Sequence, residues 1–554
     1  MAVLAHLSQP TTQDPYRYQH GFNNHHASEA FAGALPRAGT NLPQKHPYGL
    51  YAEHLNGTAF ISSRESVSNV WMYRVRPSAA HRSLRPCTAH NEIESCFLPT
   101  NPNVTFTPLS HTWGPLPSTD DNNNNNVNSN GTSSTTSTTF LQSLRTIAGH
   151  GDPTLRTGLA VHQYAFTADM TRQALTSHDG EMLLVPQRGT LDLQTELGYL
   201  RVAPGSIAVI PAGVRFSVVL ASFPAPAGGA AGYVLEIFGA HFRLPELGPL
   251  GGNALAHVRD FQYPVASFDL DFDRPAAATA ATANLVSSPP VGGGGPLFER
   301  DWEIVVKVAG RFHAYTQPHT PYDVVAWHGR YAPYKYDLAR FGHLTANSDQ
   351  LDPTAYCVLT APSLQPDVSL VDFCVFGEKW AVARDTLRIP YHHRTVATEL
   401  MGIIKGKYGG SVRRLEAGGL SFEQGFMGHG ETYECWREQS QRALGAEFVG
   451  KDCLSFMFHV PGQVALTKYA TERHPDIRLD DTTLWDNLRA PFIDKLGEAS
   501  RALEKMRISN EAAIQAELTA LAFEVMANKR RLSSVCVTDD EWTERREVPE
   551  RPGQ

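Results

Sequence analysis

Two histidines and a glutamate in the C-terminal half of the chain carry the side chains that metal ions bind. The stretch "PYHHRTVATELMG" at 390–402 contains His393 and, six positions later, Glu399, and His429 follows in "GFMGHGETYECW". Two imidazoles and one carboxylate on one side of an ion, with open positions opposite, form the facial triad of non-haem Fe(II) and O₂ chemistry. A zinc hydrolase can use the same donor types, with one position left for water.

The spacing of His393 and Glu399 fits neither regular element alone. On one straight strand, six steps separate two side chains by roughly 20 Å. On one helix, six steps of about 100° each place the side chains on well-separated faces. The chain must therefore turn between them if both bind one ion. The alternative is that His393 is a polar core residue, Glu399 a solvated charge and His429 a turn residue.

The surrounding sequence favours short strands. Apolar runs such as "EMLLVPQRG", "SIAVIPAG", "RFSVVLAS" and "YVLEIFGAHF" alternate with Gly and Pro, and a second such block runs from 301 to 460. Runs of this length between turn residues are typical of antiparallel sheets folded as a sandwich or barrel. Helical periodicity is found mainly at 484–508 and 511–531. The pattern predicts a mainly β protein with peripheral C-terminal helices.

Two motifs suggest which β fold this is. "GSIAVIPAGVRF" places Gly205, Pro211, Gly213 and Phe216 at the spacing G-x5-P-x-G-x2-F. This resembles the second motif of the cupin superfamily, with Phe216 in place of the metal-binding histidine; the alternative is a β-turn with ordinary glycines. The first cupin motif, H-x-H-x(3,4)-E, likewise fits the segment from His393 onward, with Thr395 in the place of the middle histidine. We expect two cupin-like β-sandwich or barrel domains, the first without metal because phenylalanine cannot ligate.

The expected domain organisation follows from these motifs and from two stretches that resemble insertions. "STDDNNNNNVNSNGTSSTTSTT" is polar and almost free of apolar residues, and a later stretch ends in four glycines. We expect an N-terminal arm and the start of the β-domain at 1–117, a low-complexity insertion at 118–150, a metal-free cupin-like domain at 151–300 with a flexible loop at 274–296, an Fe(II)-binding cupin-like domain at 301–480, and C-terminal helices and a tail at 481–554.

Composition excludes several classes of partner. The 554-residue chain has a net charge of −8, which gives no reason to expect nucleic acid or an anionic membrane as partner. The N-terminal stretch lacks a basic region followed by a long apolar segment, and no later segment has the length of a membrane span. The seven cysteines are scattered and form no CxxC pair, so neither a disulfide framework nor a zinc ribbon is indicated. We expect a reduced, cytoplasmic protein.

Longer stretches resemble the homogentisate 1,2-dioxygenase family. They include "HGFNNHHASEAFAGALPRAGTNLPQKHPYGLYAEHLNGTAFISSR" (20–64), "GYVLEIFGAHFRLPELGPLGGNALAHVRDF" (232–261), "YDVVAWHGRYAPYKYDL" (322–338) and "YHHRTVATELMGIIKGKYGG" (391–410). The resemblance implies an Fe(II) enzyme that opens the ring of a para-dihydroxylated aromatic acid with both atoms of O₂. For homogentisate the product is maleylacetoacetate, a step in tyrosine and phenylalanine catabolism. It also implies a homo-oligomer, a trimer or hexamer.

The resemblance assigns roles to individual residues. His393, Glu399 and His429 fall on the family's iron ligands, and Tyr408 in "GKYGG" matches a tyrosine at the substrate carboxylate. Tyr391, Thr395 and Glu423 are further candidate substrate contacts. That list already contains two departures: the family has an asparagine at the position of Thr395 and a histidine at that of Glu423.

A third departure concerns the proton acceptor. The family's D-H-x-D-P segment, whose histidine is thought to take the proton of the substrate hydroxyl, reads "DQLDP" at 349–353. Gln350 therefore occupies the position of the catalytic base, yet an amide cannot accept a proton near neutral pH. His343 or His392 are candidates to replace it, or iron itself lowers the hydroxyl pKa enough.

These substitutions leave three functions open. One is the cleavage of homogentisate. The second is a paralogue that cleaves another hydroquinone or dihydroxy-aromatic compound, for example in secondary metabolism, because a carboxylate at Glu423 disfavours an anionic substrate. The third is a non-catalytic cupin-like binding protein.

Overall fold

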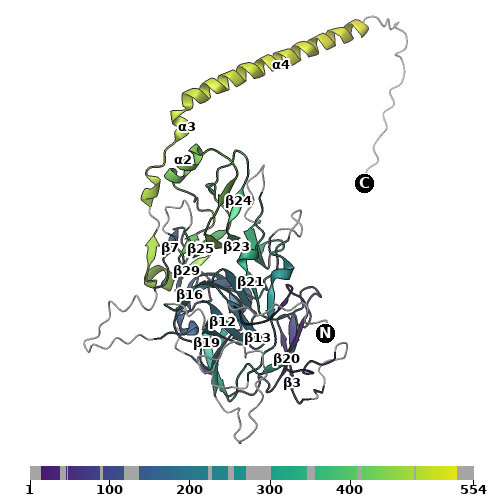
Figure 1. The fold of residues 1–554 in the computed structure, drawn as a ribbon. Helices are drawn as coiled ribbons and strands as arrows, with labels where there is room; N and C mark the ends of the chain where they lie inside the picture. The colour runs from purple at the N-terminus through teal and green to yellow at the C-terminus, as the bar shows by residue number, and fades with distance from the viewer. Residues whose placement is uncertain are drawn as a thin grey trace, which may run out of the picture. The chain divides into compact units, whose positions relative to one another are not determined.

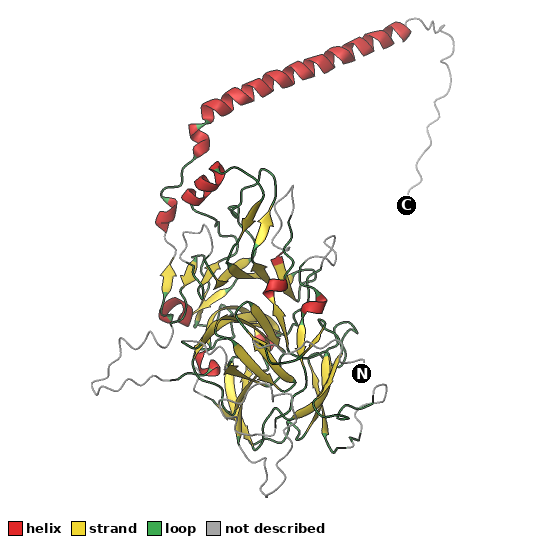
Figure 2. Cartoon of the chain, in the orientation of Figure 1, coloured by secondary structure: helices red, strands yellow, loops and turns green. Residues whose placement is uncertain are grey.

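The structure is a computed structural model of the chain. It describes residues 14–37, 45–46, 48–87, 92–117, 137–221, 228–246, 255–269, 301–345, 356–407, 415–479 and 482–532. The chain forms two compact units, 1–484 and 485–554, which are described separately below. Strands dominate the first unit and helix the second (Figures 1 and 2). The prediction of a mainly β protein with C-terminal helices is confirmed.

The largest sheet of the first unit has ten strands and is buried on both faces. In β11, Met182 and Leu184 contact one core while Leu183 and Val185 contact another. This explains the continuous apolar run of that strand, because a sheet covered on both faces has no polar side. In spatial order the strands are β1 (Tyr18–His20), β17 (Gln262–Pro264), β21 (Tyr334–Asp337), β14 (Ser206–Ile210), β11 (Gly180–Arg188), β16 (Ala230–Phe238), β9 (Thr157–Phe166), β8 (Arg145–Asp152), β29 (Ala465–Thr467) and β6 (Val104–Thr105).

A seven-stranded sheet covers one face of the ten-stranded sheet. The core between them includes Leu193, Phe216, Val218 and Val305. Its strands are β13 (Gly198–Val202), β12 (Leu191–Thr195), β15 (Phe216–Leu220), β10 (Gln173–Ser177), β18 (Trp302–Val308), β19 (Arg311–Gln317) and β5 (Arg85–Pro86), all antiparallel to their neighbours except for the pair β10 and β18.

A second seven-stranded sheet packs on the other face and carries Glu399. Leu400, Phe422 and Phe458 of this sheet share a core with Leu183 and Leu235 of the ten-stranded sheet. In Figure 1 it is found at the labels β7, β25 and β23. Its strands are β22 (Cys357–Pro362), β23 (Ser369–Phe376), β28 (Leu454–Val460), β25 (Thr398–Lys405), β26 (Leu420–Glu423), β7 (His111–Trp113) and β30 (Ile477–Leu479).

The remaining elements of the first unit are small. A four-stranded sheet contains β2 (His26–Glu29), β20 (Val324–Gly329), β4 (Asn69–Arg74) and β3 (Tyr51–Asn56), and a pair joins β24 (Lys379–Ala381) to β27 (Glu447–Val449). The helices are α1 (Phe140–Ser143), α2 (Tyr433–Gln441), a π-helical turn at Tyr469–Arg473, and 3₁₀ turns at Pro153–Leu155, Val258–Asp260 and Leu338–Arg340. A further 3₁₀ turn, Thr482–Trp485, spans the boundary between the two units.

The "GSIAVIPAGVRF" segment forms the corner between two sheets. Gly205 and Gly213 have φ of +94° and +81°, the left-handed region that favours glycine. Between them β14 lies in the ten-stranded sheet, and β15 begins at Phe216 in the facing sheet. Phe216 is buried in the core that these sheets enclose, which accounts for an apolar residue there.

Two predicted boundaries differ from the observed elements. Residues 140–150 were placed in the insertion at 118–150, but they form α1 and most of β8, because "FLQSLRTIAG" supplies the apolar side chains that the polar run lacks. A boundary was expected after residue 300, but β18 pairs with β10, and β21 pairs with β14 and β17, so these two strands lie in sheets with strands of the 151–300 range. The sequence pattern locates strands but not their partners. The predicted loop at 274–296 lies outside the described residues.

The second unit contains α3 (Pro491–Asp494) and α4 (Leu496–Leu532). Two helices were expected at 484–508 and 511–531, but α4 runs through the interruption at Ser509–Asn510 for 37 residues. Serine and asparagine only weaken a helix, and no glycine or proline follows Gly497 within it. Among the described helices, none combines the length and hydropathy required to cross a membrane.

A group of paired charges is buried in the first unit. The Lys307 ammonium lies 2.6 Å from Asp179 Oδ2 and 2.7 Å from Glu236 Oε2, and all three side chains are almost completely buried. His162 Nε2 lies 3.4 Å from the same Glu236 oxygen. Burial opposes ionisation of Glu236, but Lys307 and His162 outweigh it and lower its pKa to about 2.

We expect Glu236→Gln to lower the free energy of unfolding by about 3 kcal/mol at neutral pH, because removing one partner leaves a buried charge undercompensated. Urea-induced unfolding measures this loss. The matched control is Glu447→Gln, whose carboxylate pairs with Arg442 at the surface; it should cost less than about 1 kcal/mol. Equal losses of unfolding free energy in Glu236→Gln and Glu447→Gln would contradict a stabilising role of the buried Glu236 carboxylate.

The same variant gives a pH dependence. The folded-state pKa of Glu236 lies below its ordinary value, so its stabilisation is complete above the unfolded-state pKa and is lost as the pH falls toward about 2. The stability difference between the parent and Glu236→Gln should therefore shrink as the pH is lowered from about 6 to about 3. A constant difference would show that the carboxylate does not carry the effect.

Candidate metal centre

The two histidines are held together by the backbone. His393 N donates to His429 O at 3.0 Å, and His429 N donates to His393 O at 3.1 Å, an isolated antiparallel bridge. Directly opposed residues in such a bridge project their side chains to the same side. The imidazole centroids are accordingly 4.2 Å apart.

Two turns bring this bridge beside Glu399, the second residue of β25. Thr398 Oγ1 donates to the buried Gln424 Oε1 at 2.8 Å, and Gly425 N donates to Thr398 Oγ1 at 3.3 Å. Phe426 N donates to Thr395 O at 2.6 Å. A Cβ atom at Gly425 would lie 2.5 Å from Val396 O, so only glycine permits this approach. The chain between His393 and Glu399 therefore folds back on the chain before His429.

The three side chains converge. His393 Nε2 lies 3.4 Å from Glu399 Oε1, and His429 Nε2 lies 3.3 Å from Glu399 Oε2. One ligand atom of each residue lies within 4.8 Å of the others, and all three residues are half-buried. Ligands at about 2.1 Å from an ion and about 90–110° apart are themselves about 3.0–3.4 Å apart. Within the described parts of the chain, no other group of three such residues meets this criterion.

A hydrogen bond at Nδ1 of each imidazole fixes its tautomer. His393 Nδ1 lies 2.9 Å from the carbonyl oxygen of Tyr391, and His429 Nδ1 lies 3.0 Å from that of Met427. A carbonyl only accepts, so each Nδ1 carries the hydrogen and each Nε2 presents a lone pair. This is the outer-shell arrangement typical of metal-binding histidines. The donor set thus fits a divalent ion.

The electrostatics support a charged carboxylate at the centre. Burial opposes ionisation of Glu399, but the hydrogen bonds that Nε2 of His393 and Nε2 of His429 donate when the imidazoles are protonated outweigh it and lower its pKa to about 2. A bound metal ion would take the place of these two protons at the Nε2 lone pairs. The hydrogen bond to Glu399 in turn raises the pKa of His393, against the effect of burial.

Of the other predicted site residues, three are described by the structure and lie next to His393 or Glu399. Thr395 lies in the turn, where its carbonyl binds Phe426. Tyr391 has an exposed side chain, and its ring centroid is 5.3 Å from that of His393. Glu423 is buried and is the β26 residue directly opposite Glu399 of β25. Gln350 and Tyr408 lie outside the described residues.

Sequence reasoning missed the residues that shape the centre. Ser110 Oγ donates to Glu423, and the Thr398–Gln424 pair fastens the two turns. Ser110 lies far away in the sequence, and a threonine or glutamine carries no motif of its own. Only the strand register reveals these contacts.

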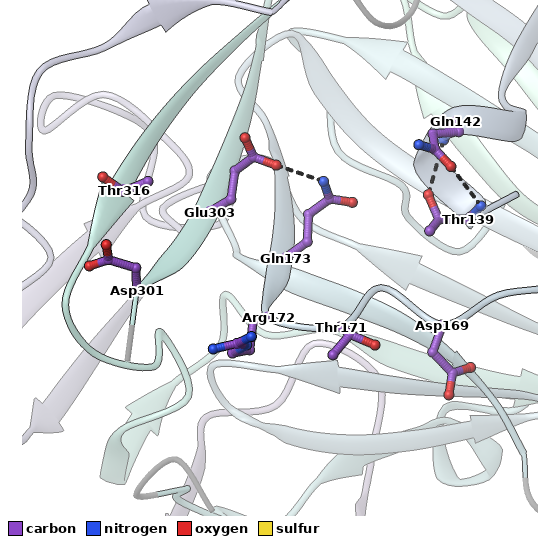
Figure 3. Close-up of a pocket in the computed structure, with 9 residues that line it drawn as sticks. All are labelled: Thr139, Gln142, Asp169, Thr171, Arg172, Gln173, Asp301, Glu303 and Thr316. Atoms are coloured by element: carbon purple, nitrogen blue, oxygen red, sulfur yellow. Dashed lines mark hydrogen bonds between the residues drawn. The ribbon is translucent and has the colours of Figure 1, made fainter. Parts of the chain in front are cut away.

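The structure also contains two surface hollows outside the triad. One of about 510 Å³ lies beside α1, β10 and β18, and its lining is polar, with Gln173 donating to Glu303 (Figure 3). Another of about 550 Å³ lies against α2. Neither is lined by His393, Glu399 or His429.

The fold and the centre together define a mainly β protein with a candidate metal site of two histidines and one glutamate. The chain belongs to the homogentisate 1,2-dioxygenase family: the family's N-terminal domain matches residues 17–282 and 296–338, and its C-terminal domain matches residues 340–492. The resemblance noted from the sequence is thereby confirmed. The matched residues end at 492, within α3, so the whole of α4 lies beyond them.

Individual relatives agree with the family. Homogentisate 1,2-dioxygenase of Caenorhabditis elegans is 37% identical over 467 residues, covering 84% of this chain and 95% of the relative. That of Emericella nidulans is 36% identical over 489 residues, covering 87% and 97%. The structure of oxalate decarboxylase from Bacillus subtilis overlaps with 66% of this chain and 83% of that chain, with 12% identity and a TM-score of 0.21.

We expect His393→Ala, His429→Ala and Glu399→Gln each to weaken iron binding more than about 100-fold, since losing a ligand exceeds the 10–100-fold cost of losing an outer-shell partner. Iron content after anaerobic loading and desalting measures this. The matched control is His392→Gln, because His392 Nε2 binds the carbonyl of Glu431 and a glutamine amide can replace that bond. Iron retained by any of the three ligand variants would contradict the assignment.

Proposed function

We propose that this protein is an Fe(II)-dependent ring-cleaving dioxygenase that converts homogentisate to maleylacetoacetate with O₂, as a cytoplasmic homo-oligomer, a trimer or hexamer. The observation that carries the proposal is the convergence of His393, Glu399 and His429 in a member of the homogentisate 1,2-dioxygenase family. The relatives from Caenorhabditis elegans and Emericella nidulans bear the name of this activity.

Each group has a defined part in this proposal. When bound, Fe(II) supplies Lewis acidity and a common site for the aromatic substrate and O₂. His393 and His429 hold it through Nε2 and keep their orientation through Nδ1. Glu399 supplies one negative charge, so a bound Fe(II) retains one positive charge for the substrate oxygen. Tyr408 would bind the substrate carboxylate, and Tyr391 and Thr395 would line the pocket.

O₂ uptake tests this function. Ferrous protein mixed with homogentisate should consume one equivalent of O₂ and form a product that absorbs in the near ultraviolet, since ring opening extends the conjugation of the product. Glu399→Gln, loaded and assayed identically, should show none. The absence of O₂ uptake with homogentisate and with every neutral hydroquinone tested would leave the non-catalytic binding protein as the function.

A second candidate, cleavage of a hydroquinone without the acetate group, is favoured by the position of Glu423. Its carboxylate is buried on the strand next to Glu399, with a hydroxyl donor in Ser110. Directly opposed residues of antiparallel strands have Cβ atoms about 4.5–5.5 Å apart. A second carboxylate this close to the centre repels an anionic substrate.

We expect Glu423→Gln to lower the KM for homogentisate about fivefold and to leave the KM for a neutral hydroquinone unchanged, because the variant removes about 1 kcal/mol of like-charge repulsion and keeps the shape. Steady-state O₂ uptake with both substrates measures the two values. A matched control, Glu447→Gln, changes a half-buried glutamate of the β24–β27 pair, which lies in a different sheet from Glu423. Parallel changes for the charged and the neutral substrate would exclude a charge effect.

A further inference from the structure

A row of polar side chains crosses the sheet that carries Glu399. One residue from each of β22, β23, β28, β25 and β26 belongs to it, and the strand register places each of these residues directly opposite the next. The residue before β7, Ser110, joins the end of the row through its hydrogen bond to Glu423. We call this the polar row: Thr360, Asp372, His459, Glu399, Glu423 and Ser110. The residues next to it in the strands, such as Phe373, Phe458, Leu400 and Phe422, point into the core. The polar row therefore lies on the opposite face, with the metal centre.

His459 is the only histidine of this row and lies between two carboxylates. In the register it is opposite Asp372 on one side and Glu399 on the other. Its Nδ1 lies 3.3 Å from Asp372 Oδ2. Asp372 is held in turn by Thr360 Oγ1 at 2.6 Å and Ser369 Oγ at 2.9 Å. Burial opposes ionisation of Asp372, but hydrogen bonds from His459, Thr360 and Ser369 outweigh it and lower its pKa.

This geometry leaves one nitrogen of His459 available. An ionised Asp372 only accepts, so Nδ1 carries the hydrogen and Nε2 presents a lone pair. Among the described residues, Nε2 of His459 has no hydrogen-bond partner, and no side-chain hydrogen bond joins His459 to Glu399. Neighbouring strands are about 4.8 Å apart, so the imidazole lies one strand from the metal ligand on the same face. An imidazole oriented by a carboxylate is the usual arrangement of a catalytic base.

The two other candidate bases fit less well. Burial and the nearby Lys379 lower the pKa of His343 to about 4, which makes it a weak acceptor. His392 Nε2 is engaged with the carbonyl oxygen of Glu431. In His459, by contrast, the hydrogen bond to Asp372 is made through Nδ1, and Nε2 remains available to accept a proton.

We propose that Nε2 of His459 accepts the proton of the substrate hydroxyl, the task for which Gln350 lacks an acceptor nitrogen. The hydroxyl O–H bond breaks, its electron pair stays on the oxygen, and an N–H bond forms at Nε2. Asp372 balances the positive charge of the imidazolium. The inference rests on the proposed function, because it requires a hydroxylated substrate beside Glu399.

The test compares His459→Asn with the parent. Asparagine keeps a donor for Asp372 but has no basic nitrogen, so the fold and the iron content should be retained while kcat for the best substrate falls by about 10²–10⁴. Asp372→Asn keeps the imidazole but disturbs its orientation and removes the balancing charge, so it should lower kcat less than His459→Asn. The matched control is His81→Asn, because His81 is an exposed histidine whose ring contacts Tyr315 of another sheet. This variant should leave kcat and the iron content unchanged.

Two rescues separate a base from a structural residue. Adding Gln350→His to His459→Asn restores the family's base and should recover kcat, and free imidazole should partly recover His459→Gly. A parent enzyme that consumes no O₂ with any dihydroxy-aromatic compound would overturn the proposed function, and this inference with it. An active parent with a fall in kcat below tenfold, or a fall that neither rescue reverses, would overturn the role of His459 alone.

Discussion

Two backbone hydrogen bonds between His393 and His429 hold the imidazoles of the metal centre side by side. Everything else at the site depends on this bridge. The turn before Glu399 and the turn before His429 are joined by hydrogen bonds of the Thr398 hydroxyl with Gln424 and Gly425. The bridge fixes the positions of His393 and His429, at which the two turns meet. The backbone carbonyls of Tyr391 and Met427 then hold the rings with Nε2 facing the carboxylate. Backbone contacts therefore set the positions of the two imidazoles, and the side-chain contacts of Thr398 and Gln424 fasten the turns beside them.

The arrangement of the sheets explains why polar and acidic side chains surround the candidate metal centre. One face of the Glu399 sheet is apolar and packs on the ten-stranded sheet, while the other presents the polar row. Three carboxylates, Asp372, Glu399 and Glu423, lie in that row with one histidine between the first two. Such a row can bind a cation and handle protons, but it repels an anion. The proposed base at His459 and the proposed effect of Glu423 on substrate charge are two consequences of the same register.

The ligand trio and the fold class could be predicted because each has a local pattern. The strand runs, the G-x5-P-x-G motif and the segment from His393 to Glu399 are each contiguous in the sequence. The structure brings His393, Glu399 and His429 together, as the cupin-like motif and the family resemblance indicated. The polar row could not be predicted, since it depends on which strands are neighbours: Asp372, His459 and Ser110 come from three distant segments. The boundary expected after residue 300 differs from the sheets for the same reason. Helix α4 is longer than the two helices expected from the sequence, because Ser509 and Asn510 lower helix propensity without ending the helix.

Anomalous X-ray scattering at the iron edge, from crystals of protein loaded with Fe(II) without air, tests the central claim most directly. The account predicts one strong peak per chain, about 2.0–2.2 Å from Nε2 of His393, Nε2 of His429 and a carboxylate oxygen of Glu399. A peak bound by other residues, or crystals of folded, loaded protein with no peak between these three side chains, would contradict it.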